Sequence, residues 1–172
     1  MENNMREETF GEQIVGANWD GNIQFLQDSV DKGLFDPLKI TEPEHWNYLH
    51  RANLIRPSPE RTILFYLEKG VPINAQDCYG MTPLHYAVRS GNYEAVKVLL
   101  EAGANPNISN QDGSNPLDLG FELPVNLNLI ELLLQHGADI HHEVNGWTVI
   151  NFIKEYDPNP NKELMQLLEK YA

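Results

Sequence analysis

The sequence predicts an all-α fold in which pairs of helices repeat along the chain and stack as a solenoid. Three glycines, Gly70, Gly103 and Gly137, recur at spacings of 33 and 34 residues. A run of apolar residues with helical spacing precedes each glycine, and a short segment with turn-forming residues follows it. A period in this range is typical of stacked supersecondary units, each of which buries its apolar face against the next unit.

One repeat shows the elements of a unit in order. Thr82 and Pro83 indicate the start of a first helix, because proline is favoured at the first helical position. Gly91 then interrupts the helical pattern, and Gly103 supplies the left-handed residue that ends a second helix. The apolar stripe of this second helix consists of Ala95, Val96, Val98, Leu99 and Leu100.

This unit resembles the consensus of an ankyrin repeat. Residues 82–87 match the Thr-Pro-Leu-His-x-Ala motif of that family, and residues 103–107 match the segment that follows its second helix. The resemblance implies an ankyrin-repeat solenoid of helix-turn-helix units joined by β-hairpin loops. It also implies that His85 is a structural histidine of the turn.

The register of this unit extends over nearly the whole chain and is clearest from about 41 to 142. Residues 49–52 align with 84–87, and residues 17–22 align with 87–92. We therefore expect one ankyrin-repeat domain, residues 1–172, whose five units lie near 8–40, 41–75, 76–109, 110–142 and 143–172. The two outer units are expected to be degenerate caps, which must present a polar outer face.

Two kinds of departure from the family pattern predict irregular geometry. Asp118 and Asn151 stand where the motif has histidine, so the hydrogen bonds of these turns must be rebuilt. Pro124, Pro158 and Pro160 fall between the two helices of the fourth and fifth units. Because proline cannot continue a helix, these breaks are expected to differ from the one at Gly91.

Composition limits the class of protein. The chain has a single cysteine, Cys78, which excludes an internal disulfide and suits a reducing compartment. No apolar run approaches the length of a membrane span, and the first residues do not resemble a signal peptide. We therefore expect a cytoplasmic protein that does not contact the membrane.

The charge of the chain is strongly negative and unevenly distributed. The chain has 25 Asp and Glu against 12 Lys and Arg, a formal net charge of −13. No Lys or Arg occurs between Lys97 and Lys154, whereas that window holds seven acidic residues. Such a field disfavours nucleic acid, whose phosphates need Lys or Arg, and accelerates encounter with a basic protein. The alternative is that the acidic residues serve only solubility.

The family resemblance implies that a partner would lie on the concave side, against the hairpin tips and the first helix of each unit. Three kinds of position face that side: the residue before the Thr-Pro position, the residues before the hairpin glycine, and those before the helix break. The expected partner-binding residues are Trp19, Asp20, Glu44, Trp46, Tyr79, Met81, Arg89, Asp112, Glu122 and Trp147. The alternative for Trp19 and Trp147 is that they cover the ends of the core.

This set of residues favours a basic protein as the partner. Tryptophan and tyrosine are enriched among the residues that dominate binding energy at interfaces. Carboxylates beside them would pair with Lys or Arg, and the aromatic rings would add cation–π contacts. The strip that these residues form therefore matches a protein ligand rich in Lys or Arg.

Two groups of residues resemble a metal site and a catalytic pair, but each has a simpler explanation. His141 and His142 are adjacent in one predicted hairpin, where two histidines rarely converge on one metal ion, and no zinc-ligand spacing occurs. Cys78 and His85 lack a third group to orient them as nucleophile and base. We therefore expect no catalytic residue, metal or cofactor.

The sequence thus predicts a non-catalytic module that captures one basic protein through its concave face and inhibits it. In size it resembles the short ankyrin inhibitors of cyclin-dependent kinases, and in acidity it resembles bacterial immunity proteins that neutralise a toxin. The main alternative is a passive scaffold or adaptor in a larger assembly, and the remote one is an enzyme or metal-binding protein. The free chain is expected to be a monomer.

Overall fold

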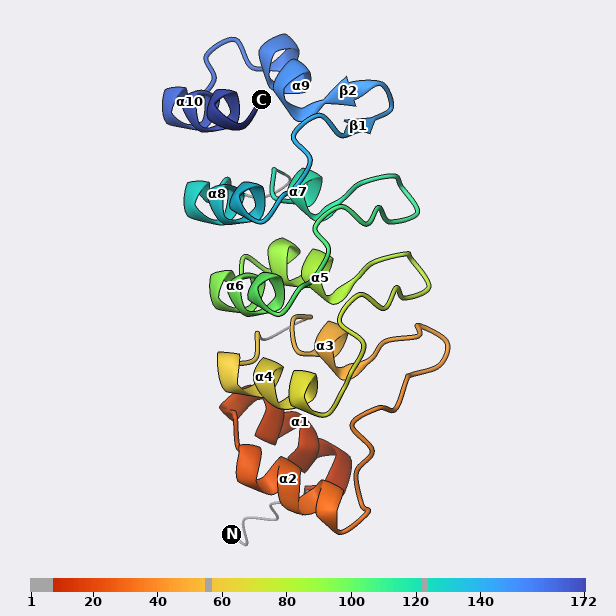
Figure 1. Cartoon of the computed structure of the whole chain (residues 1–172). Coiled ribbons are helices and arrows are strands. Elements are labelled where there is room, and N and C mark those ends of the chain that lie inside the picture. The colour runs from red at the N-terminus through yellow and green to blue at the C-terminus, as the bar shows by residue number, and fades with distance from the viewer. Residues whose placement is uncertain (1–7, 55–56, 122–123) are drawn as a thin grey trace, which may run out of the picture.

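The computed structural model describes residues 8–54, 57–121 and 124–172. In these residues the helices follow one another as pairs, with one short β-hairpin before the last pair (Figure 1). The helices are α1 (Phe10–Asp20), α2 (Ile23–Asp31), α3 (Tyr48–Arg51), α4 (Glu60–Glu68), α5 (Pro83–Arg89), α6 (Tyr93–Glu101), α7 (Pro116–Leu119), α8 (Leu127–Gln135), α9 (Val149–Tyr156) and α10 (Lys162–Tyr171). Strands β1 (Glu143–Val144) and β2 (Trp147–Thr148) pair antiparallel, with Val144 opposite Trp147.

The helix pairs stack into an elongated solenoid. From the second pair onward, the first helices and the hairpin loops occupy one side and the second helices the other (Figure 1). Helix α5 packs on its own partner α6 and on the first helices α3 and α7, while α6 packs on α4 and α8. This arrangement confirms the predicted all-α solenoid of repeated helix pairs. None of the helices in the described ranges combines the length and the apolar character needed to cross a bilayer.

One continuous apolar core runs the length of the stack. Successive pairs each contribute aliphatic side chains that are inaccessible to solvent, and they include Leu26, Leu49, Ile63, Leu99, Leu133 and Leu168. Each unit therefore buries its apolar face against its neighbours, as the repeat period indicates.

The helix ends follow from a few residue types. Gly70, Gly103 and Gly137 adopt φ angles of 80°, 91° and 83°, a left-handed conformation that glycine adopts without strain and that ends α4, α6 and α8. At the start of α5, the Thr82 side chain accepts a hydrogen bond from the His85 backbone N–H, and His85 Nδ1 accepts one from the Thr82 N–H at 3.0 Å. The orphan amides of the first turn are thereby satisfied.

The histidine of this motif also links one unit to the next. His85 Nε2 lies 3.2 Å from the Ser114 carbonyl oxygen, and His50 Nε2 lies 3.1 Å from that of Met81. Burial lowers the pKa of His85 to about 4, so its ring is neutral and Nε2–H is the donor. The motif histidine thus fixes the spacing of adjacent hairpins.

The fourth unit achieves the same link with different residues. Asp118 occupies the histidine position, and its Oδ2 accepts from the Asn115 backbone N–H at 2.8 Å. His142, from the loop before β1, places Nε2 2.7 Å from the Gly113 carbonyl oxygen and 3.6 Å from Asp118 Oδ2. The imidazole that bridges the two units therefore comes from the following hairpin.

Candidate protein-binding groove

The hairpin loops lie side by side because backbone and side-chain hydrogen bonds join each to the next. The Cys78 N–H donates to the Glu44 carbonyl at 2.9 Å, and the Gln111 N–H donates to the Tyr79 carbonyl at 3.0 Å. The Gln111 side-chain amide also donates to the Cys78 carbonyl at 2.8 Å. This row of loops stands next to α3, α5 and α7 (Figure 1). The groove is the hollow between them, which is lined by loop residues such as Tyr79 and by helix residues such as Leu119.

A concave pocket of about 510 Å³ lies in this groove. We call it the central pocket. It is lined by Trp46, Leu54, Tyr79, Met81, Tyr86, Arg89, Asn110, Asp112, Ser114 and Leu119. Residues from three consecutive units therefore converge on one hollow, which is the arrangement a groove-bound protein segment requires.

A buried carboxylate fixes the aromatic side chains of the central pocket. Asp77 accepts hydrogen bonds from Trp46 Nε1 at 2.9 Å and from the Tyr86 hydroxyl at 2.6 Å. It also accepts from the backbone N–H groups of Tyr79 and Met81, each at 2.8 Å. Burial opposes ionisation, but these hydrogen bonds, led by that of Tyr86, hold the pKa of Asp77 below its usual value. The indole of Trp46 and the ring of Tyr86 are consequently held edge to face, with centroids 6.3 Å apart.

The side chains of the central pocket differ in exposure. The ring of Tyr79 is 57% exposed, and Trp46 is half-buried. The expectation that Met81 is an exposed hairpin-tip residue is wrong, since only 4% of it is accessible. Its sulfur lies 3.4 Å from Asn110 Nδ2, and the neighbouring hairpin covers it. Met81 therefore contributes to the floor of the pocket rather than to its rim.

Both signs of charge are present around the central pocket. The Arg89 guanidinium lies 5.0 Å from the centroid of the Tyr86 ring, and Arg89 is exposed. Asp112 is exposed on the next hairpin. The Tyr86 ring thus already stabilises one cation, and Asp112 lines the same pocket.

The structure brings five of the ten expected site residues together and separates four others. Trp46, Tyr79, Met81, Arg89 and Asp112 all line the central pocket. Four lie apart from it: half-buried Trp19 in a different pocket beside α1, exposed Asp20 at the end of α1, half-buried Glu44 in the loop before α3, and Trp147 in β2. Glu122 falls outside the described residues. Five of the expected residues therefore share one hollow, and the binding role of the whole set stays a prediction.

Further groove residues follow from the repeat register but were not among those expected. Tyr86 and Leu119 line the central pocket, and Phe152 occupies the equivalent position of the next first helix, α9. Phe152 is 53% exposed, and its ring packs against Tyr156 with centroids 4.8 Å apart. Trp147, which is 38% exposed, packs on the same Tyr156 at 5.7 Å. Counting forward from Tyr86 by the repeat period would have found Leu119 and Phe152.

Comparison with known proteins agrees with this architecture. The sequence model of the family described as Ankyrin repeats (3 copies) matches residues 29–110 and 49–144. A putative ankyrin repeat protein of Rickettsia felis is 32% identical over 145 residues, which cover 79% of this chain and 60% of that protein. Ankyrin repeat protein nuc-2 of Neurospora crassa is 27% identical over 187 residues, which cover 89% of this chain and 17% of that protein.

The chain therefore belongs to the ankyrin-repeat family. A Caenorhabditis elegans homolog of transient receptor potential cation channel subfamily A member 1 shares 53% identity over 53 residues, only 4% of its length. This chain spans less than two thirds of each of these three relatives. Ankyrin repeats are protein-binding modules and are usually non-catalytic. Across the described ranges, no three His, Cys, Asp or Glu side chains are grouped so as to hold a metal ion.

Proposed function

We propose that this chain captures one basic protein in the groove between its hairpin loops and first helices, and inhibits it by covering its active surface. The observation that carries the proposal is the central pocket, where exposed Tyr79 stands beside Trp46, whose indole is hydrogen-bonded to buried Asp77. Aromatic side chains held in one orientation lose little conformational entropy on binding, and such residues dominate binding energy at interfaces.

Charge supports a basic partner. The half of the groove beyond α6 contains no Lys or Arg until Lys154, whereas exposed Asp112, Glu143 and Glu155 lie along it. The exposed aromatic residues Trp147 and Phe152 lie between Glu143 and Glu155 in the chain. Lys and Arg side chains of a partner would pair with the carboxylates and stack on the aromatic rings.

The proposal is tested by affinity capture from the native host with the wild-type chain and two single variants. Tyr79→Ala removes an exposed groove ring, and Tyr93→Ala removes a ring that is 36% exposed on α6, in the second-helix row. We expect Tyr93→Ala to bind the partner as the wild type does. Tyr79→Ala should lose about 2 kcal/mol of binding free energy, which lowers the affinity roughly 30-fold. The captured protein should be basic and should lose its activity when the chain is added in equimolar amount.

Equal loss of the partner with both variants, or equal retention, would show that the groove is not the binding surface. A captured protein that keeps its activity would instead support a passive adaptor. That second candidate is favoured by one observation, namely that the related arrays form parts of longer proteins. An adaptor should hold two different proteins at once, which size-exclusion chromatography of the mixture would detect.

A further inference from the structure

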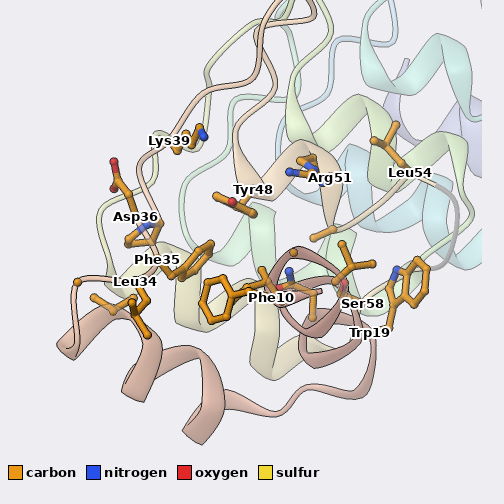
Figure 2. Close-up of a pocket in the computed structure, with 18 residues that line it drawn as sticks. Phe10, Trp19, Leu34, Phe35, Asp36, Lys39, Tyr48, Arg51, Leu54 and Ser58 are labelled. Carbon is orange, nitrogen blue, oxygen red and sulfur yellow. The ribbon is translucent and has the colours of Figure 1, made fainter. Parts of the chain in front are cut away.

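A second and larger pocket, of about 950 Å³, lies between α1 and α3 beside the loop that joins α2 to α3 (Figure 2). We call it the N-terminal pocket. Its walls include four aromatic residues, with Phe10, Phe35 and Tyr48 on one side and Trp19 on the other (Figure 2). Phe35 is buried and packs edge-on against Tyr48 at 4.9 Å, whereas Phe10 is 39% exposed. The pocket can therefore accept an apolar side chain.

The described residues leave the N-terminal pocket open along α1. Gly11 lines it, and a Cβ atom at Gly11 would meet only the Thr9 hydroxyl oxygen, at 4.0 Å. Further along the stack, the corresponding space is closed because α5 packs directly on α3 and α7.

Two cations border this pocket in an otherwise strongly acidic chain. Lys39 and Arg51 line it, and neither forms an ion pair with an acidic side chain of the described residues. Asp36 also lines the pocket, and its carboxylate points away from Arg51 in Figure 2. The two cations are therefore available to an anionic group that enters from solvent.

The position of Arg51 is fixed by the aromatic side chains beneath it. Its guanidinium lies 5.4 Å from the centroid of the Tyr48 ring. That ring is stacked on Tyr66 with centroids 5.0 Å apart and an interplanar angle of 8°, and the Tyr66 hydroxyl donates to Asn18 Oδ1 at 2.6 Å. Arg51 consequently presents a planar, ordered donor group, which suits bidentate pairing with a carboxylate.

From these observations we infer that the N-terminal pocket binds an acidic peptide segment, whose apolar side chain enters between Phe10 and Tyr48 while a neighbouring carboxylate pairs with Arg51 and Lys39. Leu54 lines both this pocket and the central pocket, so the two recognition sites adjoin in one groove. Their chemistry is opposite, because the N-terminal pocket selects an anion. This site does not depend on the basic partner proposed above.

Short peptides test the inference without knowledge of the native partner. The probes are acetyl-Glu-Leu-Phe-Glu-amide, its lysine counterpart acetyl-Lys-Leu-Phe-Lys-amide, and the polar acetyl-Glu-Ser-Ser-Glu-amide, each titrated into the full ¹⁵N-labelled chain. We expect only the first to shift the amide resonances of α1, α3 and the loop around Lys39. The resonances around Tyr79 should stay in place.

Single-residue variants then separate the contribution of the two cations to peptide binding from that of the cavity. Arg51→Gln and Lys39→Gln are each expected to lower the affinity for the acidic peptide by about fivefold, which is the upper range for a partly exposed ion pair. Gly11→Leu should fill the pocket and abolish binding while the chain stays folded, because Leu is a better helix former than Gly. Lys97→Gln, which changes an exposed cation on α6, should leave the affinity unchanged.

Three results would each overturn the inference. The first is that the acidic peptide causes no shifts at millimolar concentration. The second is that the lysine peptide causes shifts as large as those of the acidic peptide. The third is that the affinity for the acidic peptide is the same in Arg51→Gln, Lys39→Gln and Gly11→Leu as in the wild type. Failure of the proposed basic partner to bind the groove would leave these peptide titrations unaffected. The two proposals can therefore fail separately.

Discussion

Asp77 is the residue on which the geometry of the central pocket depends. Its carboxylate is 7% exposed and accepts four hydrogen bonds, from two side chains and two backbone amides. Such a group orients its donors, and its loss leaves all of them unsatisfied in a region with little access to water.

Asp77→Ala should therefore destabilise the chain by about 3 kcal/mol or more, measured by urea denaturation at neutral pH. Asp112→Ala, which changes an exposed carboxylate of the same pocket, is the control and should alter the free energy of unfolding by less than about 0.5 kcal/mol. Similar stabilities of the two variants would mean that the hydrogen bonds of Asp77 do not hold the hairpin.

Two of the three aromatic residues that line the central pocket, Trp46 and Tyr79, should respond differently to truncation. Trp46 is half-buried and donates to Asp77, so Trp46→Ala should cost about 2 kcal/mol of stability. Tyr79 projects its ring into solvent, so Tyr79→Ala should change stability by less than about 0.5 kcal/mol. Thermal unfolding of both variants checks this. A stable Trp46→Ala chain would contradict the inferred role of the indole N–H.

At the scale of the helix and its turn, the buried motif histidine makes stability depend on pH. Burial lowers the pKa of His85 to about 4, compared with about 6.5 in an unfolded chain. Between these values the unfolded chain binds a proton that the folded chain does not, so stability falls as the pH is lowered from about 6.5 to about 4. Burial also lowers the pKa of His50, which adds to the effect.

Urea denaturation at pH 7.5, 6 and 5 should show this loss, with a total for His85 of about 3 kcal/mol across the full window. His85→Gln is the control, because its side chain does not titrate. It should be less stable than the wild type at pH 7.5, and its stability should fall less steeply on acidification. Parallel pH profiles for the two chains would exclude His85 as a source of the dependence.

Most elements were predictable because their determinants are local. Gly70, Gly103 and Gly137 end helices where the sequence places them, and Thr82 begins one. The bridge between the fourth and fifth units was not predictable, since the substitution at Asp118 indicates only that the turn changes. That His142 replaces the missing imidazole follows from the path of a loop, which repeat register alone does not determine.

The site was predictable to the extent that repeat positions determine exposure. Tyr79 is exposed as expected, but Met81 is covered because the adjacent hairpin lies against it. The N-terminal pocket could not be foreseen, because the path of the loop that carries Phe35 and Lys39 is not determined by the repeat register. Their proximity to Tyr48 results from the packing of the whole N-terminal end.

At the scale of the whole molecule, the two ends of the groove differ in the sign of their charge. The N-terminal pocket carries Lys39 and Arg51, whereas the half beyond Lys97 carries no Lys or Arg until Lys154. A partner with basic and acidic segments would therefore bind in one direction only. Electrostatic complementarity of this kind sets orientation and association rate more than affinity.

The association rate with a basic partner should consequently fall as salt rises, by about tenfold or more between low ionic strength and about 0.5 M, because the Debye length shrinks well below the width of the groove. The double variant Asp112→Asn, Glu155→Gln should associate more slowly at low salt and show a smaller salt dependence. Glu68→Gln, an exposed carboxylate at the end of α4, is the matched control and should change the rate less. Stopped-flow measurements across the salt series decide the matter. A rate that does not vary with salt would mean that the acidic residues confer solubility and do not steer the partner.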